Sequence, residues 1–142
     1  MLAGHAPIAY EDGGQLRDYV YVGDVARANL LVLEDPCADY QVFNVGGGAA
    51  TSVLQYGALV AQVLGVDLDV AVPGEYRFGD TRHIISDISR LRSLGWEPST
   101  ALPQIIAEYA AWAREQSDLG DPYAQAEQVM KQLGTVRTAG AA

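Results

Sequence analysis

Apolar residues recur at the spacing of an amphipathic helix in five parts of the chain. Between residues 25 and 33 they fall on one face, and Asp24 precedes them as a candidate N-cap. Residues 52–64 repeat the pattern, with Thr51 or Ser52 as the cap. The pattern predicts helices over residues 25–33, 52–64, 88–95, 100–116 and 121–134, the third and the last closed by Gly95 and Gly134.

Alternating and β-branched runs predict short strands between these helices. The strands are expected at residues 7–10, 17–22, 40–45 and 68–72, with a short extended piece at 83–87. Residues 73–82 have no apolar periodicity and contain two glycines and a proline, so a loop is expected there. The result is a mixed α/β order, with too few consecutive parallel β–α units for a complete doubly wound sheet.

The charge of the chain narrows the class of partner. A formal net charge of −9 over 142 residues disfavours binding to nucleic-acid backbones. Eight of the nine basic residues are arginine, and a guanidinium fork fits phosphate oxygens bidentately. Five arginines lie in or beside turn-rich segments and are candidates for holding a small anion, with surface ion pairing as the alternative for each: Arg17, Arg77, Arg82, Arg90 and Arg92.

Several other classes of protein are disfavoured. The chain has no run of eighteen apolar residues that would span a membrane, and no basic region leads into an apolar stretch near its start. One cysteine, Cys37, and two histidines, His5 and His83, provide neither a disulfide framework nor a zinc constellation. We therefore expect a soluble cytoplasmic protein that binds no metal.

The glycine-rich stretch "VGGGAATS" has the outline of a dinucleotide-binding turn. Gly46, Gly48 and Thr51 occupy the positions of G-x-G-x-x-G/A, but a β-branched threonine is poor at the third position, which must be small. Such a turn also normally follows the first strand of its domain. We therefore interpret the glycines as a tight strand-to-helix turn, with cofactor binding as the alternative.

Catalytic residues are not evident in the sequence. Short-chain reductases and epimerases use a Tyr and a Lys spaced as Y-x-x-x-K, in which the lysine lowers the pKa of the tyrosine. The only lysine is Lys131, and Glu127 stands four residues before it. Neither a nucleophile elbow nor a P-loop is present. The chain alone is therefore expected to be inactive.

Three motifs in order resemble one family. "EDGGQLRDYVYVGDVARANLLVLE", "VFNVGGGAATSV" and "GEYRFGDTRHIISDISRLRSLGWEPSTALPQII" are similar to segments of extended short-chain dehydrogenases that act on nucleotide sugars. The ending "DPYAQAEQVMKQLGTV" also looks like that of 4-epimerases acting on dTDP-rhamnose or related sugars. The resemblance covers about residues 7–110 and only the C-terminal part of the family's NAD(P)-binding, Rossmann-like fold. It implies a nucleotide-sugar-binding unit over residues 1–134, a flexible tail over 135–142, and a missing N-terminal Rossmann half.

The resemblance also implies roles for individual residues. Arg17 and Arg77 match the two arginines that contact the substrate pyrophosphate, and Asp80 matches the carboxylate that accepts hydrogen bonds from the ribose. Ile8 and Tyr10 match the extended piece beside the base. Two forked cations suit a diphosphate, and an acceptor-only carboxylate suits a diol.

Structural alternatives remain open for these residues. Arg17 could pair with Asp18 or Asp24, and Arg77 with Glu75 or Asp80. Arg82 and His83 also match the motif, with a ligand role and structural packing of that loop as alternatives, and together with Asp24 they are candidates for supporting the loop or the site. Gly23 departs from the family, which usually has an acidic or polar residue there.

Two functions follow from the resemblance. The first is the substrate-binding part of an NAD-dependent sugar-nucleotide epimerase or dehydratase, with a 4-epimerase as the first expectation and a dTDP- or UDP-sugar as ligand. NAD would serve the complete enzyme, and none is expected to bind this chain alone. A Rossmann-half partner or self-association is expected, because a sheet fragment exposes edges and apolar faces. The alternative is a non-catalytic binding or assembly module, or a truncated fragment without activity of its own.

Overall fold

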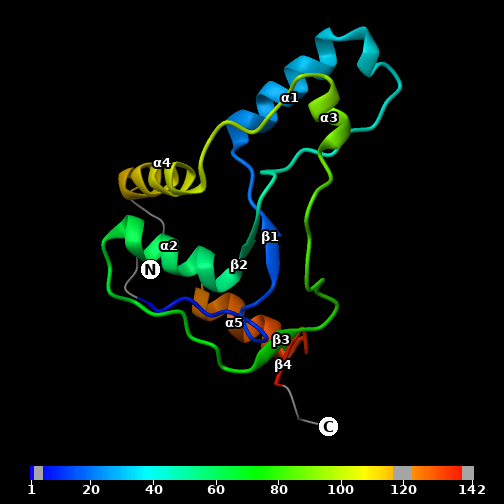
Figure 1. The fold of residues 1–142 in the computed structure, drawn as a ribbon. Helices are drawn as coiled ribbons and strands as arrows, with labels where there is room; N and C mark the ends of the chain where they lie inside the picture. The colour runs from blue at the N-terminus through cyan, green and yellow to red at the C-terminus, as the bar shows by residue number, and fades with distance from the viewer. Residues whose placement is uncertain (2–4, 117–122, 139–142) are drawn as a thin grey trace.

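The computed structural model describes residues 1, 5–116 and 123–138. Helices and short strands alternate along the chain, as Figure 1 shows. In chain order the elements are β1 (Leu16–Asp18), α1 (Val22–Glu34), the 3-10 helix η1 (Pro36–Ala38), β2 (Ala50–Ser52), α2 (Val53–Leu64), β3 (Glu75–Arg77), α3 (Ser89–Ser93), α4 (Leu102–Glu115), α5 (Tyr123–Gln132) and β4 (Val136–Thr138).

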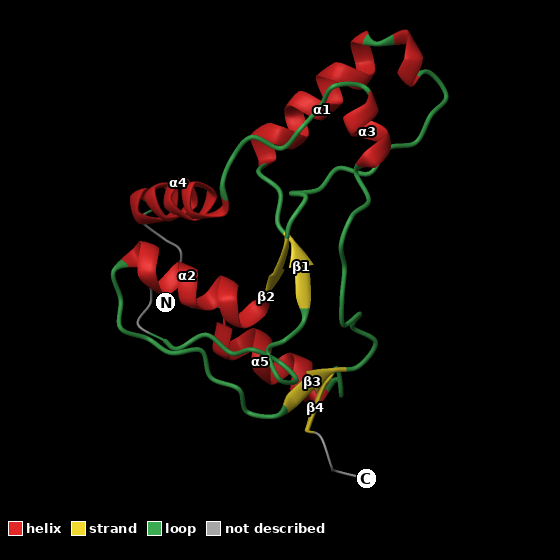
Figure 2. Cartoon of the chain, viewed as in Figure 1, coloured by secondary structure: helices red, strands yellow, loops and turns green. Residues whose placement is uncertain are grey.

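The strands among the described residues form two antiparallel pairs. β1 pairs with β2, where Arg17 lies opposite Thr51, and β3 pairs with β4, where Arg77 lies opposite Val136. The helices α1 and α3 lie together at one end of the molecule, while α5, β3 and β4 lie at the other (Figure 2). Between them, α2 continues from β2, and α4 packs against α2. The expected mixed α/β character is confirmed.

The helix α2 begins and ends where its sequence predicts. Of the two candidate caps, the structure uses Ser52: its hydroxyl accepts a hydrogen bond from the Gln55 N–H at 3.1 Å, and the Gln55 side-chain oxygen accepts one from the Ser52 N–H at 2.9 Å. This reciprocal pair satisfies two of the backbone donors that every helix leaves unpaired. Gly65 closes the helix at φ 69°, a conformation that glycine adopts without steric cost.

The start of α1 differs from the prediction. Strand β1 ends at Asp18 and α1 already begins at Val22, with Tyr21 at the N-cap, so the expected strand 17–22 is too long and the capping role of Asp24 is wrong. The Asp24 side chain is only 2% exposed. Its carboxylate lies inside the first turn and accepts hydrogen bonds from the Ser99 N–H at 3.0 Å, the Ser99 hydroxyl at 2.9 Å and the Thr100 N–H at 3.1 Å. Asp24 therefore fixes the segment before α4 to α1.

A buried carboxylate of this kind makes stability depend on pH. Burial raises the pKa of Asp24, but hydrogen bonds from Arg27, Ser99 and Thr100 outweigh burial and lower the pKa from 3.8 to about 2. Because the pKa is depressed in the folded state, its stabilisation is present above pH 4 and is lost as the pH falls through about 2. We expect the Asp24 carboxyl carbon to titrate near pH 2 by NMR, with the free energy of unfolding falling over the same range. Titration at the ordinary 3.8 would contradict this network.

The main hydrophobic cluster lies between α1 and α3. Ala28, Ile88, Leu91 and Trp96 are buried there, and Leu91 is completely inaccessible. The Trp96 indole N–H donates to the Asp24 carbonyl oxygen at 3.2 Å, so the largest side chain of the cluster also satisfies its polar atom.

The predicted strand 40–45 is wrong. Its residues lie in a loop that has no ladder partner among the described residues, although Phe43 and Val45 still pack against the α1–α3 cluster. The apolar residues of this segment thus indicate that it is partly buried. They do not make it a strand, because a strand also needs a neighbouring backbone with which to pair. The expected strands 7–10 and 68–72 do meet, but only in one parallel bridge between Ile8 and Ala71.

The pairing of β3 with β4 was not expected. Residues 73–82 were predicted as a loop and residues 135–142 as a frayed tail, yet Glu75–Arg77 and Val136–Thr138 pair, and Val136 is buried. The expectation of a frayed tail is therefore wrong for residues 136–138, whereas residues 139–142 lie outside the described part. Residues 121–122 of the last predicted helix also lie outside it.

Among residues 1, 5–116 and 123–138, no helix is both long enough and apolar enough to cross a membrane.

Candidate functional site

The side chains predicted to bind a nucleotide sugar come from two segments that the fold brings together. Residues 8–17 approach residues 75–83, chiefly through the parallel bridge between Leu16 and His83 and a 2.6 Å hydrogen bond from the Glu11 N–H to the Glu75 carbonyl. We refer to this region as the arginine site, defined by Tyr10, Glu11, Asp12, Arg17, Arg77, Asp80, Arg82 and His83.

Arg17 projects from β1 toward the second segment. Its guanidinium donates to the carbonyl oxygens of Leu16 at 2.9 Å and Arg82 at 2.8 Å, and lies 3.5 Å from a carboxylate oxygen of Asp80. Two of these three contacts are to neutral acceptors and the third is long. The structure therefore pairs Arg17 with Asp80, 63 residues away, rather than with Asp18 or Asp24, and much of its charge stays available.

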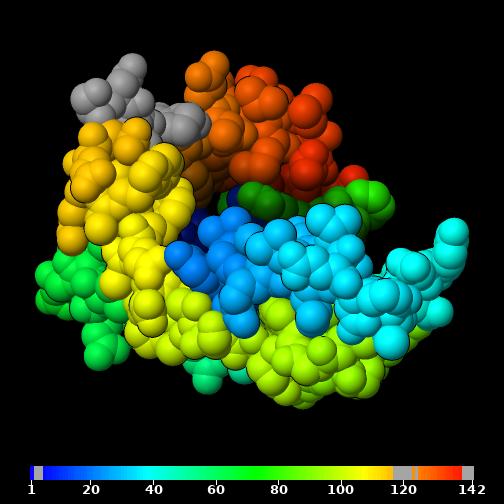
Figure 3. All heavy atoms as spheres, turned by 90° about the horizontal axis from the view of Figure 1, so that it is seen from above, coloured from blue at the N-terminus to red at the C-terminus, as the bar shows by residue number. Residues whose placement is uncertain are grey.

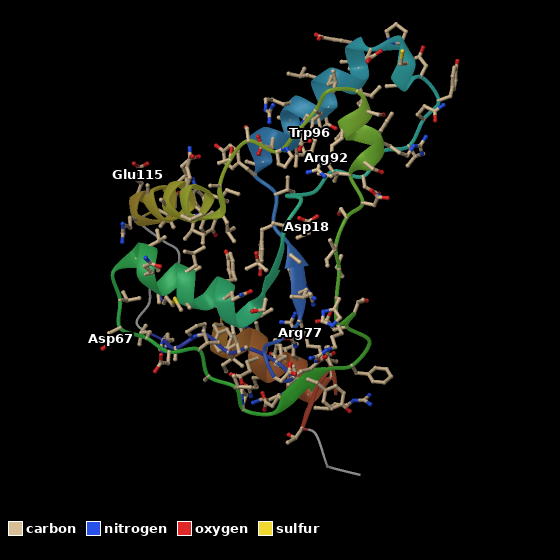
Figure 4. All side chains as sticks on the ribbon, viewed as in Figure 1. Asp18, Asp67, Arg77, Arg92, Trp96 and Glu115 are labelled. Carbon is tan, nitrogen blue, oxygen red and sulfur yellow. The ribbon has the colours of Figure 1, made fainter. Side chains whose placement is uncertain are left out.

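Arg77 and Asp80 share one turn. The Asp80 N–H donates to the Arg77 carbonyl at 3.2 Å, and an Asp80 carboxylate oxygen accepts from the Thr81 N–H at 2.9 Å. The Arg77 guanidinium carbon lies 4.9 Å from the centre of the Tyr10 ring, within the range of a cation–π contact. A ring does not neutralise a cation as a carboxylate does, so Arg77 keeps its charge. Figure 4 places Arg77 near one end of β1 and Asp18 at the other.

Arg82 has a structural role. It forms ion pairs with Glu11 and with Asp12, the latter at 2.8 Å. The hydrogen bond from Arg82, helped by one from the Gly14 N–H, lowers the pKa of Asp12 to about 2. With two carboxylates around it, Arg82 is a poor candidate for a phosphate, and it ties the turn after Tyr10 to the loop after β3.

His83 also has a structural contact. Its Nδ1 accepts a hydrogen bond from the Leu16 N–H at 3.2 Å, and the Ile84 N–H donates to the Leu16 carbonyl at 3.1 Å. These bonds align β1, and hence Arg17, with the second segment. For Arg82 and His83, these contacts favour packing of the loop over a ligand role.

The residues proposed to lie beside the base separate in the structure. Tyr10 stacks on Arg77, whereas Ile8 lines an apolar cavity of about 550 Å³ between α2, α4 and the N-terminal segment. Tyr56, Val60 and Ile106 line the same cavity. The role of Ile8 and Tyr10 at a base stays a prediction.

Asp18 is an organising residue that the sequence did not single out. Its carboxylate accepts hydrogen bonds from the Gly47 N–H at 2.7 Å and the Ser86 N–H at 3.1 Å. A Cβ at Gly46 would collide with this carboxylate, and one at Gly47 with the Tyr19 carbonyl oxygen. The consecutive glycines therefore allow close packing against the end of β1. The sequence did contain a signal for this role: Asp18 stands at the end of a predicted strand, and consecutive glycines that could pack against it occur later in the chain.

The glycine turn and Lys131 both make contacts within the protein. The glycine turn is packed against Asp18 and Tyr19, and Lys131 forms ion pairs with Glu75 and Glu127. Among the residues that the structure describes, no group of three or more His, Cys, Asp or Glu side chains could hold a metal ion.

Comparison with known proteins identifies relatives of this chain. Residues 1–46 match the model of the NAD dependent epimerase/dehydratase family. The dTDP-L-rhamnose 4-epimerase of Burkholderia thailandensis is 36% identical over 110 residues, which cover 77% of this chain and 30% of that protein. The UDP-glucose 4-epimerase of Mycolicibacterium smegmatis is 36% identical over 118 residues, covering 82% of this chain and 37% of that protein.

A solved structure gives the same result. The UDP-glucose 4-epimerase of Thermotoga maritima, crystallised with UDP-glucose, superposes with a TM-score of 0.72 at 39% identity, covering 81% of this chain and 38% of that one. The chain belongs to the NAD-dependent epimerase/dehydratase family, whose members bind NAD. It spans about a third of the length of its relatives.

Proposed function

We propose that this chain binds the nucleoside-diphosphate part of a dTDP- or UDP-sugar, as the C-terminal, substrate-binding portion of a cytoplasmic sugar-nucleotide 4-epimerase. Arg17 and Arg77 hold the diphosphate, and Asp80 accepts hydrogen bonds from the ribose. The observation that carries the proposal is the convergence of Arg17 and Asp80, with Asp80 in the same hydrogen-bonded turn as Arg77. The similarity to dTDP- and UDP-sugar epimerases supports the choice of ligand.

Binding requires one rearrangement within the site. The diphosphate replaces Asp80 as the partner of Arg17, which frees the Asp80 carboxylate to accept the ribose hydroxyls. The 3.5 Å contact between these side chains, with Asp80 41% exposed, costs little to break because exposed ion pairs contribute about 1 kcal/mol or less.

In this proposal the chain contributes positioning. It holds the nucleotide while the chemistry is carried by NAD and a tyrosine–lysine pair supplied by a Rossmann portion outside this sequence. Such a portion would either dock as a partner or be joined in the same polypeptide. We expect no sugar epimerisation by this chain alone.

Calorimetric titration of the purified chain with dTDP, UDP and NAD tests the proposal. Binding of a nucleoside diphosphate without binding of NAD is the expected result. Binding of NAD alone would overturn it and would indicate that the glycine turn, rather than the arginine site, takes the ligand.

A second function, assembly with another chain, is favoured by the exposed apolar residues of α1 and the loop after it. Val22 is 75% exposed, Leu33 82% and Val42 76%. Figure 3 shows α1 open on the face seen from above, with the following residues projecting at its edge. Exposed apolar patches of this kind mark interaction surfaces. Light scattering should show self-association that Leu33→Glu weakens; a strictly monomeric chain would argue against self-association.

A further inference from the structure

The C-terminal unit of α5 and β4 holds the strand that carries Arg77. Gly134 ends α5 at φ 67°, and β4 begins two residues later at Val136, so helix and strand form one compact unit. This unit lies beside β3 in Figures 1 and 2. The register places Val136 opposite Arg77, and the Phe78 N–H donates to the Thr135 carbonyl at 2.8 Å.

β3 needs such support because it is short and is flanked by glycines. It has three residues, and Gly74 and Gly79 on either side both have positive φ angles, 75° and 82°. An isolated two-stranded pair of this length is only marginally stable. Contacts from outside the pair must therefore help to fix the conformation of Arg77.

Lys131 provides one such contact. Its ammonium lies 3.0 Å from a carboxylate oxygen of Glu75 on β3 and 2.8 Å from one of Glu127 on α5. These acids raise the pKa of Lys131, chiefly through the hydrogen bond that its ammonium donates to Glu127 and next through the one it donates to Glu75. Glu75 is only 16% exposed, so its carboxylate depends on this partner more than a surface group would. Lys131 is the only lysine in the chain.

A second contact comes from β4. The Arg137 guanidinium carbon lies 4.0 Å from the centre of the Phe78 ring, and Arg137 also donates to the Gly134 carbonyl at 2.9 Å. This contact holds the residue that follows Arg77 against the turn between α5 and β4.

We propose that the α5–β4 unit orders β3 and thereby positions the Arg77 guanidinium for binding a diphosphate, and that Lys131 is the positioning residue that joins the unit to β3. That the ligand is a nucleoside diphosphate rests on the proposed function. Lys131 acts through Glu75 and Arg77 and does not touch the ligand.

The test is a double-mutant cycle on dTDP affinity, measured by calorimetry on the full chain. Lys131→Gln should weaken binding about two- to fivefold, the range expected for a partly exposed ion pair. Lys131→Arg, the matched control that keeps the charge, should bind like wild type. Lys131→Gln added to Arg77→Ala should weaken binding no further, because its effect passes through Arg77.

Equal weakening in both backgrounds, or no weakening by Lys131→Gln, would overturn the inference. Hydrogen exchange gives a readout that needs no ligand: residues 75–78 should exchange faster in Lys131→Gln, while α2 and α4 stay unchanged. If the wild type binds no nucleoside diphosphate, the proposed function fails, and exchange alone decides whether Lys131 orders β3. Unchanged exchange at residues 75–78 would then reject the positioning role as well.

Discussion

Replacing Asp24 with alanine should destabilise the protein by about 3–5 kcal/mol, since it removes one partner of a buried charged network. The carboxylate is almost fully buried and serves Ser99, Thr100 and Arg27, so its loss leaves two backbone N–H groups and a hydroxyl without their acceptor. The free energy of unfolding of a typical domain is only about 5–15 kcal/mol, so this substitution would remove a large part of the stability of the protein. Urea denaturation followed by circular dichroism measures the loss.

Two variants make the result specific. Asp24→Asn keeps the shape but replaces one acceptor oxygen with a donor, and it should lose most of the same stability. Asp67 is exposed, and Asp67→Asn should change stability by no more than about 0.5 kcal/mol. Equal stability of the Asp24 and Asp67 variants would contradict the role given to Asp24.

Replacing Arg17 with alanine should weaken binding of dTDP or UDP at least tenfold. A charge-assisted hydrogen bond to a ligand is worth about 1.5–3 kcal/mol, and about 1.4 kcal/mol corresponds to a tenfold change in affinity. Arg17→Lys keeps the charge but cannot bind two phosphate oxygens in a fork, so it should recover only part of the affinity. Calorimetry on both variants gives the comparison.

The matched control is another arginine with a surface ion pair. Arg92 pairs with Glu97 at 2.8 Å and is about half exposed, outside the arginine site. Arg92→Ala should bind nucleotide like wild type. If Arg17→Ala also binds like wild type while remaining folded, the charge of Arg17 serves only its contacts to Asp80 and the carbonyl of Arg82.

The helices could be predicted from sequence because their signals are local. The capping residue Ser52 and the closing glycine Gly65 lie within one turn of the helix ends that they define. Asp24 shows the limit of this reasoning. It has the right type for a cap and stands beside the right helix, but the groups it binds lie 75 and 76 residues further along the chain.

The strands were harder to predict because pairing depends on distant backbone. Glu75–Arg77 and Val136–Thr138 are each three residues long, and neither carries an apolar alternation that would distinguish it from a loop. Residues 40–45 show the opposite case: a run rich in β-branched and aromatic residues, with Phe43 and Val45 partly buried, but no strand beside it among the described residues.

The site was partly predictable. The resemblance pointed to Arg17, Arg77 and Asp80, and the structure brings Arg17 into contact with Asp80 and sets Asp80 in one turn with Arg77. The resemblance could not predict that Arg82 forms ion pairs with Glu11 and Asp12, or that Tyr10 contacts Arg77. These contacts depend on how two loops meet in the folded protein. The roles of these residues toward a ligand stay predictions.

The most direct measurement is a crystal structure of this chain with UDP or dTDP. The proposed function predicts the diphosphate between the guanidinium groups of Arg17 and Arg77, with the Asp80 carboxylate turned from Arg17 to the ribose hydroxyls. A nucleotide bound at the glycine turn, or an arginine site still closed by the Arg17–Asp80 pair at saturating nucleotide, would contradict it.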